Sequence, residues 1–182
     1  MSYFSQYEIA FKGLKEGKHQ FRFELNDKFF EKFDSSELEK GSIKCKVELT
    51  KSSSLMILEM AVKGDVELMC HRCLDNYMQA IKSKNKLFVK FGSEAGEMSD
   101  DLIVIPLTED HINLAQYLYE LVVLSLPIMH VHVPDKNGNS TCNSEMEEKL
   151  KQYLVTEEEI SEKKIEVDER WNELKKLLEN KK

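Results

Sequence analysis

Apolar and polar residues alternate through most of the first ninety positions. In residues 21–25 and 43–49 the odd positions are apolar and the even positions are charged. A two-residue period is typical of strands with one buried face. Longer apolar stretches at 55–69 and 77–91 predict two more strands, with a bulge or bend expected at Gly64-Asp65. The connections are short, which favours antiparallel pairing.

The second half of the chain changes to a helical period. After a polar, acidic loop at 92–101 and a short strand at 102–107, an apolar stripe predicts a helix that is capped by Asn113 and stopped by Pro127. Further helices are expected from Ser144 and from Asp168, and a short one within 27–33. We therefore predict an α+β fold: a mostly antiparallel curved sheet or open β-barrel with two or three C-terminal helices.

Length and charge fit one main domain with an appendage. The chain has 182 residues, and we expect a single α+β domain over 1–155 and an acidic linker with an amphipathic helix over 156–182. The net charge of −7 divides into +3 for residues 1–91, −7 for 92–144 and −3 for 145–182. The acidic middle argues against indiscriminate coating of nucleic acid but allows a local basic face.

Neither a membrane nor an export signal is indicated. No run approaches about 18 uninterrupted apolar residues, and the N-terminus lacks a basic segment followed by an apolar one. We expect a cytoplasmic protein whose cysteines stay reduced.

The pair Cys70 and Cys73 is the sharpest local motif. A C-x₂-C turn can direct two thiolates at one metal ion, and Cys142 with His132 would complete a Cys₃His zinc site. Two alternatives stay open, namely a thioredoxin-type redox pair and reduced structural thiols at a hairpin turn. Cys45, within an alternating strand, is expected to be a small buried hydrophobe.

The sequence contains no catalytic constellation. Glycine-rich phosphate loops and the G-x-S-x-G nucleophile motif are absent, and the neighbours Asp110 and His111 make a poor dyad. We expect a protein that is not an enzyme and that has no small-molecule substrate.

A stripe of lysines marks the strand at 77–91. A candidate RNA-binding face is formed by Lys82, Lys84, Lys86, Lys90 and Phe88. Lysines suit phosphate contacts and an exposed phenylalanine can stack on a base. Lysines at positions 44 and 46 form a similar stripe, and the two would build one basic face if their strands are neighbours. The alternatives are an ordinary polar sheet face and edge-strand lysines that prevent aggregation.

Four blocks of the sequence follow one another in a distinctive order. They are Cys70-His71-Arg72-Cys73-Leu74, the helix from Ile112 to Pro127, His132 followed by Cys142, and Val167-Asp168-Glu169-Arg170-Trp171 with Leu174-Lys175. Together they resemble the YceD-like family, the large ribosomal RNA subunit accumulation proteins. The similarity covers roughly residues 60–178 in blocks. Glu169 stands where the family usually has proline, and Cys142 stands alone where many relatives carry two cysteines, which leaves His132 as the natural fourth ligand.

The resemblance implies a non-catalytic factor for accumulation or processing of large-subunit (23S) ribosomal RNA, and hence for ribosome assembly. The expected partner is ribosomal RNA through the lysine stripe, or a large-subunit ribosomal protein through the acidic segment 92–110. Trp171, the single tryptophan, is a candidate partner anchor. The alternatives are a small zinc- or thiol-dependent enzyme that uses Cys70 and Cys73, and a pure protein-interaction module.

Overall fold

The computed structural model describes residues 3–33, 38–92, 96–99 and 101–154. The chain forms two compact units, residues 1–142 and 143–182, and each is described by itself. The predicted boundary after residue 155, the helix from Asp168 and the anchor Trp171 lie outside the described residues and stay predictions. Among the helices that are described, none has the length and apolar character needed to cross a membrane.

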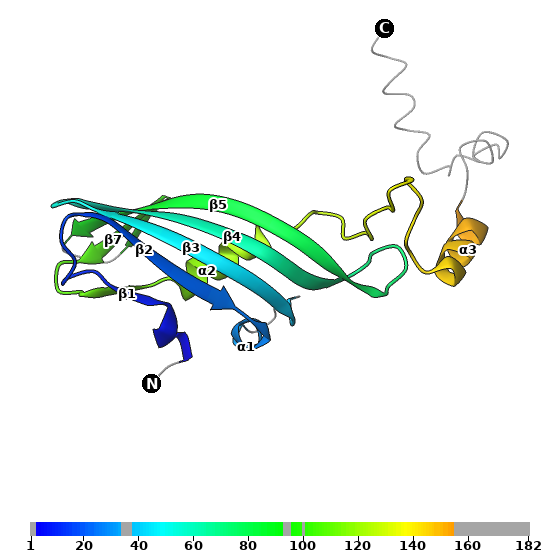
Figure 1. Cartoon of the computed structure of the whole chain (residues 1–182), viewed down its shortest axis with the longest axis horizontal. Helices are drawn as coiled ribbons and strands as arrows, with labels where there is room; N and C mark the ends of the chain where they lie inside the picture. Colours follow the sequence, from blue (N-terminus) through cyan, green and yellow to red (C-terminus); the bar gives the residue numbers. More distant parts are fainter. Residues whose placement is uncertain (1–2, 34–37, 93–95, 100, 155–182) are drawn as a thin grey trace, which may run out of the picture. The chain divides into compact units, whose positions relative to one another are not determined.

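The first unit is built on a large mixed sheet with the strand order β2-β3-β4-β5-β7-β6. Its strands are β2 (Gly17–Leu25), β3 (Gly41–Lys51), β4 (Leu55–Met69), β5 (Asn76–Gly92), β6 (Gly96–Ser99) and β7 (Leu102–Pro106). All neighbours are antiparallel except β5 and β7, which are parallel. The long strands bend strongly (Figure 1), and the edge strands β2 and β6 do not pair with each other in the described part. The predicted α+β class with a mostly antiparallel curved sheet is confirmed.

Smaller elements cover one face of this sheet. They are the 3₁₀ helix η1 (Tyr3–Tyr7), the strand pair β1 (Glu8–Ala10) and β8 (His111–Asn113), and the helices α1 (Asp27–Phe30) and α2 (Ala115–Val123). Helix α2 packs against β4 and β5, and its Leu118 and Val122 are fully buried. The core therefore lies between α2 and the inward side chains of the long strands, while the other sheet face is left to solvent.

The alternating pattern predicted the sheet faces correctly. Inward positions of β3 and β4, such as Val47, Leu49, Met56 and Leu58, are buried, and their sequence neighbours point to the opposite face. Apolar side chains enter the core because their removal from water stabilises the fold.

Two local expectations are corrected. Residues 92–101 are not all loop, because 96–99 form β6 and pair with β7. Asn113 does not occupy the N-cap position of α2, although its side-chain oxygen accepts from the Ala115 N–H. The predicted helix from Ser144 is confirmed as α3 (Ser144–Tyr153), in the second unit; it is capped by Asn143, whose side chain accepts from the Glu145 and Met146 N–H groups.

Gly64 does not form the bulge that the sequence suggests for this position. Strand β4 pairs with β3 and β5 without a register shift at this position. A Cβ atom placed on Gly64 would collide with the Ser42 carbonyl oxygen and approach the Ile43 Cα to 2.7 Å. Glycine is required here because the backbones of β3 and β4 approach closely.

We predict that Gly64→Ala destabilises the protein, because the added methyl group meets backbone atoms that cannot rotate away. The free energy of unfolding should fall by about 1–3 kcal/mol, measured by urea denaturation. The matched control is Gly13→Ala, since a Cβ on Gly13 meets nothing within 4 Å. Equal stability of the two variants would contradict the proposed reason for Gly64.

Candidate functional site

Cys70 and Cys73 lie in the tight turn that joins β4 to β5. The Cys70 N–H donates to the Asp75 carbonyl (2.9 Å), and the Leu74 N–H donates to the Cys70 carbonyl (2.9 Å). Leu74 has a positive φ of 65°, which reverses the chain. This turn buries both sulfur-bearing residues, at 0% and 1% exposure. We call residues 70–73 the knuckle.

A second segment, residues 130–142, meets the knuckle through two histidines. The His71 N–H donates to the His130 carbonyl (2.7 Å), and the His130 N–H donates to His71 Nδ1 (3.4 Å). Their ring centroids lie 4.6 Å apart. These contacts hold the loop after α2 against the tip of the β4–β5 hairpin (Figure 1).

A turn centred on Asp135 returns the loop toward its start. The Asp135 carboxylate accepts from the N–H groups of Asn137 and Asn139, both at 2.8 Å. The Thr141 hydroxyl donates to the Val133 carbonyl (2.9 Å). Asparagine and aspartate favour such turns, so the sequence itself brings Cys142 back beside His132.

The four predicted metal ligands converge. Their ligand atoms all lie within 4.8 Å of one another. Cys70 Sγ lies 3.8 Å from Cys142 Sγ, and His132 Nδ1 lies 3.5 Å from Cys73 Sγ and 3.6 Å from Cys142 Sγ. A tetrahedral zinc ion separates its ligands by roughly 3.8 Å between sulfurs and roughly 3.6 Å between sulfur and nitrogen. The residues present therefore fit zinc.

The surroundings favour the thiolate form of Cys70. Burial raises its pKa, but hydrogen bonds from the N–H groups of Cys73 and Arg72 and from His132 outweigh this effect. The pKa falls to about 6. A cysteine with this pKa is mainly thiolate at neutral pH, which is the form that binds metals. Burial, together with the neighbouring thiols, raises the pKa of Cys142.

An aromatic neighbour orients the histidine ligand. The Tyr77 ring packs on the His132 ring, with centroids 4.9 Å apart. Burial, followed by the charge of Cys70, raises the Tyr77 pKa, so the phenol stays neutral beside the thiolate. Orientation of a ligating imidazole by nearby groups is common in metal sites.

The remaining cysteine is separate from this cluster. Cys45 is buried on the inner face of β3, and burial raises its pKa to about 12. The prediction of a small buried hydrophobe at this position is confirmed. The element after Cys73 is the strand β5, so the helix N-terminus that activates a thioredoxin-type pair is missing at the knuckle.

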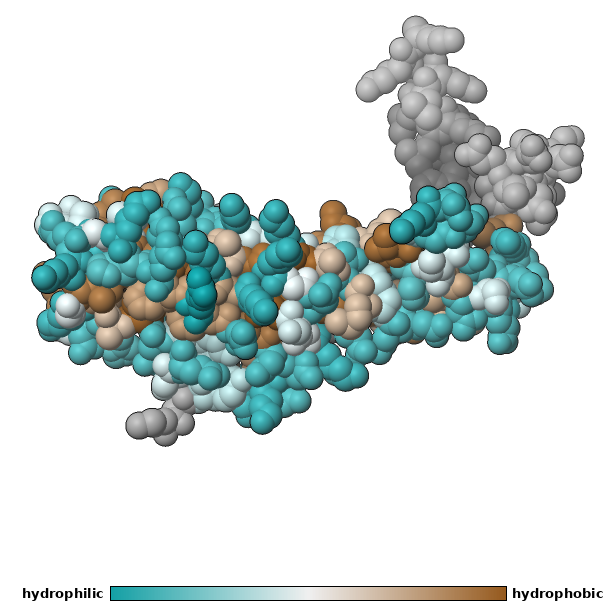
Figure 2. Space-filling view, in the orientation of Figure 1, coloured by the Kyte–Doolittle hydropathy of each residue, from teal (hydrophilic) through white to brown (hydrophobic). Residues whose placement is uncertain are grey.

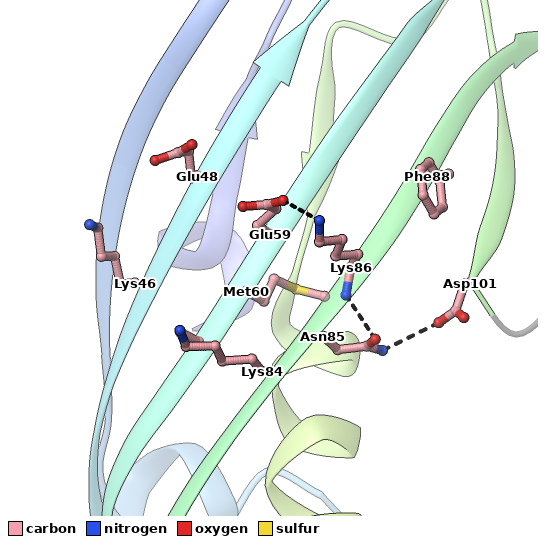
Figure 3. Close-up of a pocket in the computed structure, with 10 residues that line it drawn as sticks. Lys46, Glu48, Glu59, Met60, Lys84, Asn85, Lys86, Phe88 and Asp101 are labelled. Atoms are coloured by element: carbon pink, nitrogen blue, oxygen red, sulfur yellow. Dashed lines mark hydrogen bonds and ion pairs between the residues drawn. The ribbon is translucent and has the colours of Figure 1, made fainter.

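The predicted RNA-binding side chains share the outer face of β5. Lys82, Lys84, Lys86 and Lys90 are exposed and Phe88 is half-buried. Lys86 forms an ion pair with Glu59 (2.6 Å). A surface hollow of about 550 Å³ lies here, and Figure 3 shows Lys84, Lys86 and Phe88 along its β5 side. Whether these residues bind RNA stays a prediction.

The strand with Lys44 and Lys46 is not a neighbour of β5. Strand β4 lies between them, with Ala61 between Lys46 and Lys84, and Lys63 between Lys44 and Lys82. The lysine stripes nevertheless share one face, because both pairings are regular. Sequence reasoning missed Lys63 and Arg22 as members of this face; their outward alternation was the available signal.

Comparison with known proteins gives one match. The family model described as "Large ribosomal RNA subunit accumulation protein YceD" matches residues 58–178, which is more than half of the chain. The matched region includes all four ligands of the candidate metal centre. No curated protein and no solved structure matches the chain.

We predict that the protein purified without added metal carries about one zinc ion per chain, because three cysteines and one histidine form a complete ligand set. Cys73→Ser and His132→Ala should each lower the zinc content severalfold, measured by elemental analysis. Cys45→Ala is the matched control and should keep its zinc. Less than a few tenths of an equivalent in the wild-type protein, with all four thiols reacting freely, would disprove the site.

A second prediction concerns thiol reactivity. In the folded protein, Cys45 should resist iodoacetamide with or without a chelator, because it is buried and its pKa of about 12 keeps it protonated. Cys70, Cys73 and Cys142 should become labelled only after chelation, as mapped by mass spectrometry. Labelling of all three at the same rate before and after chelation would contradict a metal-bound state.

Proposed function

Because the chain belongs to the YceD family, whose name denotes large ribosomal RNA subunit accumulation, we propose that it is a non-catalytic factor for accumulation of 23S ribosomal RNA. The observation that carries the proposal is the family match over residues 58–178. In this role the protein binds RNA or an RNA–protein intermediate during assembly of the large subunit, in the cytoplasm.

The candidate metal centre supports a structural role for zinc. Structural zinc sites have four protein ligands, whereas catalytic sites keep one position for water or substrate. Cys70, Cys73, His132 and Cys142 make four ligands. The two cysteines of the knuckle are buried, and His132 and Cys142 are half-buried. When bound, zinc would tie the β4–β5 turn to the segment 130–142, and the enzyme alternative has no open coordination position to use.

The solvent face of the sheet supports contact with RNA. The outward side chains of β3, β4 and β5 include many lysines and are not covered by any described element. Figure 2, drawn from the same side as Figure 1, shows hydrophilic residues over much of the molecule's surface in this view. Electrostatic contact with phosphates is the main source of affinity for RNA.

We predict that a strain that lacks this protein contains less 23S ribosomal RNA relative to 16S and fewer mature large subunits. Both are measured by RNA quantification and by sucrose-gradient profiles. Expression of the wild-type chain from a plasmid should restore them, and an empty plasmid is the control. Normal 23S RNA and normal subunit profiles in the deletion strain would refute the proposed function.

A further inference from the structure

The regular register of β2 to β5 arranges the outward side chains in rows across the sheet. One row consists of Arg22, Lys46, Ala61 and Lys84, and the adjacent row consists of Glu24, Lys44, Lys63 and Lys82. The two rows hold six cations, which we call the cationic strip: Arg22, Lys44, Lys46, Lys63, Lys82 and Lys84.

The six cations of the cationic strip outnumber the single carboxylate in its two rows, that of Glu24. All six side chains are exposed, and in the part of the chain that the structure describes none of them forms an ion pair. Neighbouring strands lie about 4.8 Å apart and alternate residues about 6.7 Å apart, so the strip covers roughly 14 by 7 Å. Like charges at this spacing repel, and a bound polyanion would relieve the repulsion.

The rows beside the strip have a different character. In the next row toward Phe88, Glu48 pairs with Lys18 (2.8 Å) and Glu59 pairs with Lys86 (2.6 Å). This row holds two carboxylates and one cation, Lys86, whose charge is used within it; Lys18 comes from the following row, opposite Thr50. On the other side, the row of Ser42, Asp65 and Ala80 carries a carboxylate and no cation. The strip therefore has defined edges.

The chemistry of the strip fits phosphates and not bases. Lysine presents a compact charge, and the two rows contain no aromatic side chain on which a base could stack. Phe88 lies two rows from Lys84, beyond the row that contains Glu59 and Lys86. Lys46 lines two hollows, of about 550 and 370 Å³, and Figure 3 shows Lys46 and Lys84 on either side of β4. The surface is thus open to a backbone laid across it.

We propose that the cationic strip binds the phosphate backbone of large-subunit ribosomal RNA without reading its sequence. The identity of the RNA rests on the proposed function, whereas the binding surface is inferred from the cross-strand rows of exposed cations. The strip keeps Lys82 and Lys84 of the predicted lysines, adds Arg22, Lys44, Lys46 and Lys63, and leaves out Lys86, Lys90 and Phe88.

The test measures the affinity of the full-length protein for two labelled hairpins, one transcribed from 23S ribosomal RNA and one of scrambled sequence. Both should bind equally, with affinity that falls as salt increases. Lys46→Glu with Lys84→Glu should weaken binding by about tenfold or more and lower the salt dependence by about two ions. Lys12→Glu with Lys15→Glu makes the same change in net charge at exposed positions outside the sheet, and its affinity should stay within about twofold.

Each alternative outcome is decisive. An equal loss in both double variants, or no loss in either, would overturn the proposal. If the circular dichroism spectrum of the glutamate variant differs from that of the folded wild-type protein, Lys46→Gln with Lys84→Gln replaces it and should still weaken binding severalfold.

A wild-type protein that binds neither hairpin, but binds a purified large-subunit ribosomal protein through these lysines, would assign the strip to a protein partner. Normal 23S RNA in the deletion strain would remove the biological role and leave the affinity ratio unchanged.

Discussion

The register between β4 and β5 determines where the functional side chains of the first unit lie. The two strands pair without a slip from Leu55–Lys90 to Met69–Asn76. Side chains alternate between faces, so a slip of one residue would move the lysines of β5 to the core and its buried residues to solvent. Gly64 supports the pairing on the other side of β4, because its missing side chain lets β4 lie close against β3. The same pairing ends at the knuckle, which fixes the direction of its two thiols.

The sequence was sufficient for the faces of the strands but not for the order of the strands. Alternation is a local property, so the shared face of Lys82 and Lys84 could be predicted from neighbours in the chain. Pairing is not local, so only the structure shows that β4 lies between β3 and β5 in the sheet. Lys63 was missed because the other charged positions of its strand, Glu59, Asp65 and Glu67, are acidic, so no basic stripe is visible along that strand. Short strands such as β6 and β8 exist through pairing, which propensity alone does not predict.

The candidate metal centre was likewise predictable from the sequence only in part. The spacing of Cys70 and Cys73 predicts a half-site, because a tight turn directs both residues to one point. The approach of Cys142 to His132 follows from the turn residues around Asp135, which are also local. The contact between the two halves depends on His71 and His130, whose pairing could not be predicted from any local pattern. That pairing depends on how far the β4–β5 hairpin extends past the loop that follows α2.

The candidate metal centre and the cationic strip are stabilised by different interactions. At the tip of the hairpin, Met69, Leu74 and Met78 are more than half exposed, so little apolar surface is buried there. A turn with so few buried contacts gains little from the hydrophobic effect, and a four-ligand metal ion would supply the missing stabilisation. The cationic strip, by contrast, lies over the buried residues of β3 and β4, including Val47, Met60 and Val62. The core holds the strip in place, so the geometry of the lysines does not depend on the metal centre. The candidate metal centre at the tip of the hairpin and the charged rows on β2 to β5 thus have independent structural support.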